Sequence, residues 1–421
     1  MRLLEAKKGV NSRYATLLAR DVLPVQTAHL KESFELAPAS KLAEAACMAT
    51  NQAIEAWEKK QGTRRLKPGE LLLEQEGRKI AIPLLTQEVL PHLKEGRSPR
   101  AVRRELEMLQ FLRLKELNPG ASVEDLWHLV NQVELSLKRG GKSAEVLPER
   151  PLDAETLKPG GRQHVGGEIP LEALKPAIAT LVDQWGARPA QAEGMVTLAA
   201  RLYTWCCPRV EELDPGQLVW LAHGTRKSRR TDPRLFQPVV LTLLTPEEQH
   251  WPLNTTADLK RLKIRQIERI TTEAWRQDSV LTTLDLEWLL GISPSLIRQL
   301  LEAYNERFGV LLPTAGTVLD MGRTLTHKAL VVEMALEGLT TQEIARRIYH
   351  TPEAVDNYLR LFDRVLLLRY YHVPASAMMR ITGHSQSLLE EHLALVEKHF
   401  PDEESLVSYI GKRGIKLEKS S

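Results

Sequence analysis

The chain has 421 residues, of which 43% are hydrophobic and 26% charged, and these proportions exclude collagen-like, fibrous and wholly disordered proteins. At about 100 to 200 residues per domain, this length predicts two to four domains. The 57 lysines and arginines nearly balance the 54 aspartates and glutamates, which leaves a formal net charge of +3. The chain as a whole therefore has no strong field that would attract nucleic acid or a membrane surface, and any such surface must be local.

The cysteines and the first residues indicate where the protein resides. Cys47, Cys206 and Cys207 contain no C-x-x-C spacing, so they predict neither a disulfide framework nor a zinc site. The opening residues MRLLEAKKGVNSRY lack the apolar run of a signal peptide. No later stretch offers the roughly 18 uncharged apolar residues that a membrane span needs. We expect a cytoplasmic protein without membrane contact.

The N-terminal two thirds of the chain repeat one pattern. A proline-led helical stripe over residues 37–57 ends on tryptophan, and a similar stripe over residues 187–205 does the same. The pair Pro68-Gly69 then recurs as Pro215-Gly216, and each pair is typical of a turn that opens a strand. A second strand and a helical stripe follow in both copies. The sequence therefore predicts two related modules, each with helices and a β-hairpin.

Composition divides the chain into four segments. A first module covers residues 1–138, and an exposed linker rich in glycine, proline and charge covers residues 139–168. A second module covers residues 169–280. From residue 281 to 421 the sequence becomes densely helical. The predicted fold class is mainly α, within the α+β group: two helix-plus-hairpin modules followed by tandem helix-turn-helix units.

The hairpin of the second module has the longer tip. Its residues HGTRKSRRTDPR stand where the first module has only EGRK, so the insertion concentrates positive charge. A basic β-ribbon can follow phosphates or enter a groove of DNA, and the alternative is a solvated loop. The cations of this tip are Arg226, Lys227, Arg229, Arg230 and Arg234.

Three segments of the C-terminal region fit the pattern of a helix-turn-helix. Each contains a helix-capping hydroxyl, and an apolar anchor follows it four residues later. For each segment the alternative is a purely structural helical hairpin. We call them the first, middle and third frames; their capping residues are Ser293, Thr351 and Ser385, and their anchors are Ile297, Val355 and Leu389.

The middle frame, residues 338–359, satisfies the pattern best. Thr340 and Glu343 form a capping-box signature, and Ala345 is small enough to let two helices approach closely. Arginines on this frame are suited to phosphates, Asn357 to adenine, and Glu353 to the amino group of cytosine. The candidate DNA-binding residues of the chain are Arg346, Arg347, Thr351, Glu353, Asn357, Arg360, Ser293, Ser295, Arg298, Arg226, Lys227, Arg229 and Arg230.

Charge complicates this hypothesis. Residues 281–421 contain 15 lysines and arginines against 18 aspartates and glutamates, whereas a DNA-reading surface is normally basic. Glu353 and Asp356 on the predicted recognition helix would repel phosphates. Either the docking surface is small, or another element such as the basic hairpin supplies positive charge.

Two resemblances agree with these patterns. The middle frame is similar to the C-terminal DNA-binding domain of quorum-sensing and response-regulator transcription factors, whose motif G-L-T-x-x-E-I-A appears as GLTTQEIA. Over a longer span, from LDPGQLVWLA to MMRITGHSQSLLEEHL, the chain resembles a bacterial and archaeal family known as domain of unknown function 1670. This second resemblance covers about residues 210–395. It implies an architecture and no assigned activity.

Motifs of enzymes do not appear in the sequence. The pair Cys206-Cys207 precedes Pro208 at the end of a helical stripe and is typical of buried structural thiols. There is no HExxH, no phosphate-binding GxxxxGK[ST] and no strand-linked GxGxxG, although a nuclease with scattered acidic ligands would leave no such motif. We therefore expect no catalytic residue, no metal site and no cofactor.

The function that the sequence favours is sequence-specific binding of double-stranded DNA by a transcriptional regulator. The sequence allows a homodimer but does not determine the oligomeric state. Two alternatives stay open. In one, the protein is an interaction scaffold whose helix-turn-helix units only pack against other proteins. In the other, it is an accessory protein of a mobile element that uses the same DNA-binding chemistry.

Overall fold

The computed structural model divides into two compact units, Met1–Ala315 and Gly316–Ser421. Helices dominate and one small antiparallel sheet accompanies them, which confirms the predicted fold class. The sequence placed the start of the helical region at residue 281, whereas the first unit continues to Ala315. The structure describes residues 17, 20–75, 77–84, parts of 107–130, 168–225, 232–249, 255–319, 326–349, 352–384 and 386–412.

The hairpins of the two predicted modules join in a single sheet, to which β5 adds a fifth strand. Its order is β2-β1-β3-β4, with β5 paired to β3, and all neighbours are antiparallel. The modules therefore share a sheet instead of folding as separate domains. The strands are β1 (Glu70–Gln75), β2 (Arg78–Pro83), β3 (Gln217–Gly224), β4 (Phe236–Thr242) and β5 (Ser279–Val280).

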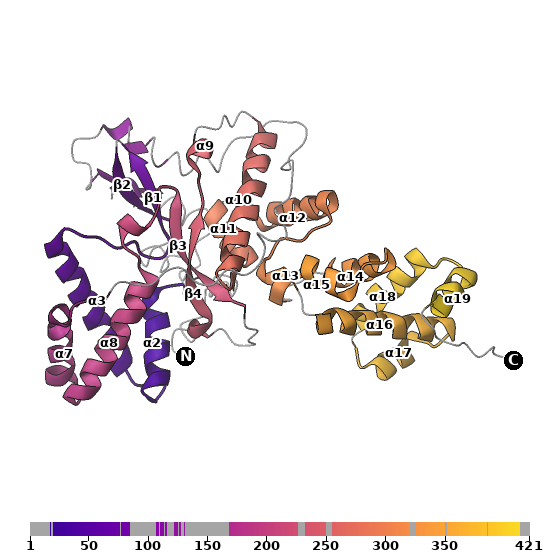
Figure 1. The fold of residues 1–421 in the computed structure, drawn as a ribbon, viewed down its shortest axis with the longest axis horizontal. Coiled ribbons are helices and arrows are strands. Elements are labelled where there is room, and N and C mark those ends of the chain that lie inside the picture. Colours follow the sequence, from indigo (N-terminus) through magenta and orange to yellow (C-terminus); the bar gives the residue numbers. More distant parts are fainter. Residues whose placement is uncertain are drawn as a thin grey trace. The chain divides into compact units, whose positions relative to one another are not determined.

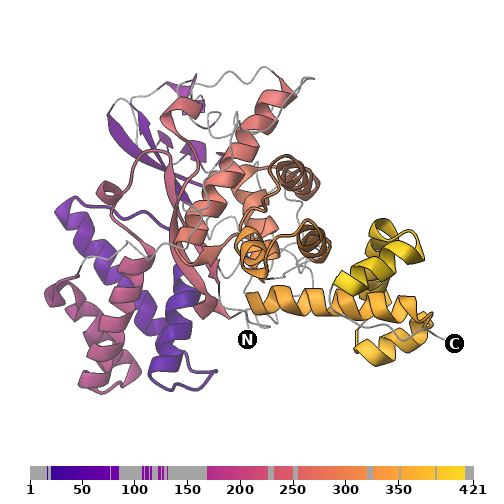
Figure 2. The ribbon, with the colours of Figure 1, turned by 45° about the vertical axis from the view of Figure 1, so that its right-hand side comes forward.

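The helices that precede the two hairpins also combine. α2 (Val22–Ser33) and α3 (Leu42–Gln61) belong to the first copy, and α7 (Leu171–Trp185) and α8 (Pro189–Cys206) to the second. α3 packs against both α7 and α8, and α2 packs against α8, so contacts across the copies accompany those within each copy. The four helices gather around one apolar cluster below the sheet (Figures 1 and 2).

The two copies meet at positions that the repeat makes equivalent. Leu71 of β1 lies opposite Leu218 of β3, and each follows its Pro-Gly pair by two residues. The bonds beside this pair are reciprocal, as they would be around a twofold axis. Gly69 and Gly216 there have φ values of 87° and 88°, a left-handed conformation that glycine adopts readily. Gly69 N–H donates to Val219 O (2.8 Å), and Gly216 N–H donates to Leu72 O (2.6 Å).

Equivalent residues of the two copies also form equivalent hydrogen bonds at the two outer edges of the sheet. Gln110 donates its side-chain amide to Pro83 O at the end of β2. Arg269 donates its Nε–H to Thr242 O, the corresponding carbonyl at the end of β4, over 2.7 Å. Glu70 faces Pro83 in one hairpin as Gln217 faces Thr242 in the other. The resemblance between the copies therefore extends from the strands to the helices that cover them.

One difference between the copies has a clear physical reason. Thr242 N–H points out of the β4 edge and donates to Glu273 Oε2 over 2.7 Å. The corresponding residue of the first copy is Pro83, which has no N–H to satisfy. The residue that corresponds to Glu273 is Leu114, which is buried. An acceptor is therefore present in the copy that has a donor, and an apolar side chain replaces it in the other.

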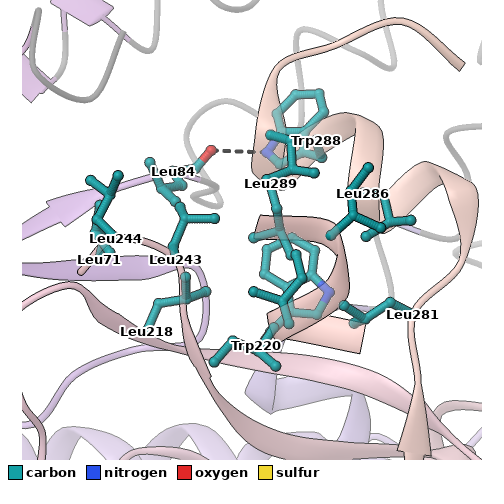
Figure 3. Packing of buried hydrophobic residues seen from close by; sticks show 14 of the residues in the cluster. Leu71, Leu84, Leu218, Trp220, Leu243, Leu244, Leu281, Leu286, Trp288 and Leu289 are labelled. Carbon is teal, nitrogen blue, oxygen red and sulfur yellow. Dashed lines mark hydrogen bonds between the residues drawn. The ribbon is translucent and has the colours of Figure 1, made fainter. Parts of the chain in front are cut away.

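The other side of the sheet supports the largest apolar core. α10 (Thr256–Arg276), α11 (Thr283–Leu290) and α12 (Pro294–Phe308) supply much of it, and capping boxes begin α10 and α11. Figure 3 shows Trp220 of β3 and Trp288 of α11 in this core, where Trp288 Nε1–H donates to Leu84 O over 2.9 Å. Short elements complete the first unit: η2 (Val210–Glu212), η3 (Pro233–Leu235) and α9 (Pro246–Gln249), and α13 (Ala315–Leu319) lies at the division.

The second unit is built around its longest helix, α16 (Pro352–Tyr370). This helix contacts each of the other helices that follow α13, and apolar side chains cover two of its sides. Phe362 and Leu366 belong to one cluster, and Leu361 and Val365 to the other. The remaining helices are α14 (Thr326–Leu336), α15 (Thr341–Ile348), α17 (Ala375–Thr382), α18 (Gln386–His399) and α19 (Glu403–Lys412).

Candidate nucleic-acid interface

Each predicted frame consists of an eight-residue helix, a three-residue connection and a longer helix. The first frame is α11–α12, the middle frame α15–α16 and the third frame α17–α18. All three anchors are buried, namely Ile297, Val355 and Leu389. The residue two positions before each capping hydroxyl has a positive φ: Gly291 (67°), Tyr349 (58°) and Gly383 (72°).

The surroundings of the first helix distinguish the frames. In the middle frame, Arg346 and Arg347 lie three and two residues before Tyr349, and both are exposed. The corresponding residues of the first frame, Trp288 and Leu289, are only 6% and 5% exposed because they face the core of the first unit. In the third frame the residue corresponding to Arg347 is Ile381, which is 61% exposed. The shared geometry therefore carries three different surfaces.

Burial holds the first frame inside the first unit. Asp285 of α11 is fully buried, where it forms an ion pair with Arg20 (2.9 Å) and accepts a hydrogen bond from Trp220 Nε1 (3.1 Å). With its helix embedded in this way, α11 cannot approach a ligand. The exposed side of α12 remains accessible, and it carries the predicted residues Ser295 and Arg298.

The predicted residues of α12 have partners of their own. Ser293 caps the helix by accepting the N–H of Leu296 (3.3 Å), and its Oγ lies 2.9 Å from Ser295 Oγ. Arg298 faces Glu302 at 3.8 Å, four residues along the helix. Exposed ion pairs of this kind contribute little stability. This face is close to neutral.

In the middle frame, residues close together in the sequence determine where the first helix begins. Thr340 accepts the N–H of Glu343, whose carboxylate in turn accepts the N–H of Thr340 (2.8 Å). Hydrogen bonds from the Thr340 backbone and hydroxyl lower the pKa of Glu343, so this carboxylate is committed to capping. Ile344, Ala345 and Ile348 face inward and are buried. The predicted capping residue Thr351 of the second helix lies outside the described residues.

α16 presents an exposed polar stripe over residues 353–364. Glu353, Asn357, Arg360 and Arg364 recur at intervals of three or four residues and are all exposed. Sequence reasoning missed Arg364, although its spacing of four from Arg360 is a signal that could have found it. Where the middle frame has Arg360 and Arg364, the first frame has Glu302 and Glu306 and the third has Ala394 and Lys398.

Hydrogen bonds organise the side chains of this stripe. Asp356 accepts the hydroxyl of Thr341 on α15 over 3.0 Å, so this carboxylate bridges the two helices. Arg360 donates from Nη2 to Asn357 Oδ1 (2.9 Å) and from Nε to the backbone oxygen of Asp356 (3.3 Å). The bond to Thr341 turns one of the two predicted repulsive carboxylates into a link between helices.

The third frame is poor in available positive charge. Lys398 of α18 donates to Glu333 Oε1 of α14 over 2.6 Å, and Gln386 donates to Glu390 (2.8 Å). Met378 is the buried residue of α17, and its neighbour Met379 is only half-buried. The predicted capping residue Ser385 lies outside the described residues.

The basic hairpin is described only at its base. Arg226, Lys227, Arg229 and Arg230 lie outside the described residues. Arg234, at the end of the tip, forms ion pairs with Asp232 beside it and with Glu32 on α2. This arginine therefore joins the hairpin to the first copy, and its charge is neutralised there.

The cysteines are buried, and the described residues contain no cluster suited to a metal ion. Cys47, Cys206 and Cys207 are buried, and burial raises the pKa of Cys47 to about 12 and that of Cys207 well above its usual value. Within the same ranges, no three histidine, cysteine or acidic side chains gather as a metal site would require. None of the helices described there is both long enough and apolar enough to cross a bilayer.

Fold and site together define a mainly helical α+β protein with a pseudo-twofold first unit and an arginine-bearing helix pair in the second. Residues 208–395 match the model of the family described as "Protein of unknown function (DUF1670)", which confirms the resemblance to this family that the sequence indicated. The match begins just before β3 and ends within α18, so it leaves out the first copy. No curated protein and no solved structure gives a significant match to the chain.

Proposed function

We propose that the protein is a cytoplasmic, sequence-specific DNA-binding regulator of transcription that contacts double-stranded DNA with α15 and α16. The observation that supports this proposal is the set of four arginines on the exposed sides of this helix pair. Apolar residues occupy the opposite sides, and the same four positions of the other two frames never hold four cations. The arginines are Arg346, Arg347, Arg360 and Arg364.

The two halves of α16 suit different tasks. Its second half, with Phe362 and Leu366, is anchored in the core of the second unit. Its first half carries Glu353, Asn357 and Arg360 of the exposed stripe. A helix of about 10 to 12 Å diameter fits the major groove, which is about 12 Å wide. In this proposal the anchored half fixes the orientation of the reading half. Arg346 and Arg347 on α15 then contact the phosphates beside the groove.

Salt dependence tests this proposal directly. The double substitution Arg346→Ala/Arg347→Ala should flatten the slope of log affinity against log salt by about 0.9 for each phosphate that the variant no longer neutralises. Affinity should fall by a similar factor on matched and mismatched duplexes, because phosphate contacts carry no sequence information. Fluorescence anisotropy over a range of salt concentrations measures both effects.

Arg201→Ala is the matched control, since Arg201 is an exposed arginine on α8 of the first unit. It should leave the slope unchanged. Arg298→Ala asks separately whether the exposed side of α12 also contacts DNA. Wild-type protein that binds no duplex at low salt would contradict the proposal.

A protein-binding role is the second candidate, and the third frame favours it. Ile381 is exposed at the position where the middle frame has Arg347, and exposed isoleucine suits a protein contact better than a phosphate contact. A homodimer formed through α17 and α18 would cover it. Sedimentation of the Ile381→Asp variant tests this candidate, because the substitution should convert such a dimer into monomers.

A further inference from the structure

A hydrogen bond joins the side chains of Asn357 and Arg360 on α16. Arg360 Nη2 donates to Asn357 Oδ1 over 2.9 Å, and Arg360 Nε donates to the backbone oxygen of Asp356 over 3.3 Å. The second bond holds the guanidinium along the helix and the first fixes the amide oxygen toward it. Both side chains are exposed on the stripe that the proposed function directs at the groove.

This bond determines which hydrogen-bonding groups the pair can offer. An asparagine amide has one oxygen acceptor and two N–H donors, and a guanidinium has five N–H donors and no acceptor. Once Asn357 Oδ1 accepts from Arg360, this bond leaves for a ligand the two amide N–H donors, the other guanidinium N–H donors and one lone pair of Oδ1. The pair therefore presents mainly donors to its ligand.

The edges of the bases respond differently to such a pair. Adenine shows an acceptor and a donor in the major groove, so asparagine reads it with both its oxygen and its amide. Guanine shows two acceptors, N7 and O6. Asn357 Oδ1 keeps a second lone pair. To reach it, however, the amino group of adenine, which is a donor, would have to approach the N–H donors of the Arg360 guanidinium, and donors repel each other. A pair that offers mainly donors therefore fits guanine better than adenine.

We propose that Asn357 and Arg360 act as one unit that reads guanine in the major groove. This inference rests on the proposed DNA binding by α16 and specifies its chemistry. It changes the expectation for Asn357, which by itself is suited to adenine. Arg360 sets the preference in two ways, because it donates to the base and also occupies the oxygen that adenine would need.

Selection of bound duplexes from a random pool, with the full chain, tests the inference. Wild-type protein should select guanine at one position of its site, with a discrimination over adenine on the order of tenfold to a hundredfold. Arg360→Ala frees Asn357 Oδ1, so the preference at that position should change from guanine to adenine. Asn357→Ala should weaken discrimination there without introducing adenine.

Arg364→Ala is the matched control, since Arg364 lies on the same stripe four residues beyond Arg360. It should lower the affinity for all duplexes alike and keep guanine at the selected position. Circular dichroism of each variant checks that these exposed substitutions leave the helices intact.

The outcomes separate this inference from the proposed function. If the wild type selects no sequence and binds no duplex, DNA binding itself is wrong. If the wild type binds DNA but selects adenine, or if Arg360→Ala leaves the selected base unchanged, DNA binding stands and the guanine-reading pair is overturned.

Discussion

Ala345 lies on α15, which packs against α16, and its small side chain is predicted to let the two helices approach closely. It is buried, and its carbonyl oxygen accepts the N–H of Tyr349 in the turn that follows. Ala345→Leu would add volume to a closely packed contact and should cost about 1 to 3 kcal/mol of unfolding free energy. Gln342→Leu, on the exposed side of the same helix, should cost much less. Urea unfolding measures both, and equal stability of the two variants would mean that α15 does not pack here.

Asp285 and Arg20 form a buried ion pair in the first unit. Burial lowers the pKa of Arg20, and Asp285 opposes that shift by stabilising the charged guanidinium. Asp285→Asn leaves the buried guanidinium without a compensating charge and should cost about 3 to 5 kcal/mol. The double variant Arg20→Met/Asp285→Asn removes the stranded charge and should recover part of this stability. A double variant less stable than Asp285→Asn would contradict the argument.

At the scale of elements, the edge of β4 gives the sharpest prediction. Glu273→Leu removes the acceptor of the Thr242 N–H and should cost about 1 to 3 kcal/mol, the cost of a buried unsatisfied donor. Adding Thr242→Pro copies the arrangement that Pro83 and Leu114 show in the first copy, and it should restore most of that stability. Chemical denaturation of both variants tests this, and a double variant no better than Glu273→Leu would show that the copies are not interchangeable here.

The same glutamate predicts a dependence on pH. Burial raises the pKa of Glu273, and hydrogen bonds from Thr242 only partly offset the shift. A carboxyl whose pKa is raised on folding binds more protons in the folded state. Its contribution to stability is therefore greatest below its unfolded pKa and is lost as pH rises through the folded pKa. In Glu273→Gln this component should vanish, as unfolding measured between about pH 4 and 7 would reveal.

At the scale of the whole molecule, the two units have separate cores. Phe362 belongs to the core of the second unit, and Ile267 to that of the first. Phe362→Ala should destabilise the second unit by about 3 to 5 kcal/mol and leave the unfolding of the first unit unchanged. Ile267→Ala should do the reverse. Calorimetry should resolve two transitions, and a single transition that both substitutions shift equally would mean that the units unfold together.

The sequence by itself determined those features of this protein that depend on neighbouring residues. The Pro-Gly turns, the capping box of Thr340 and Glu343, and the spacing from capping hydroxyl to anchor all act within a few residues. Such local interactions can be predicted without knowledge of the fold. These local patterns predicted the strands that follow Gly69 and Gly216 and the helix pair that contains Ala345.

Only the tertiary structure decided which of these features are exposed and what they contact. Trp288 and Leu289 repeat the frame of Arg346 and Arg347, yet they are buried because β-strands and helices distant in the sequence cover them. The division at Ala315, where the sequence suggested residue 281, has the same cause. Whether a residue is buried depends on contacts with segments far apart in the chain, and a local sequence pattern does not show these contacts. The sequence could therefore find three similar frames, and packing made their surfaces different.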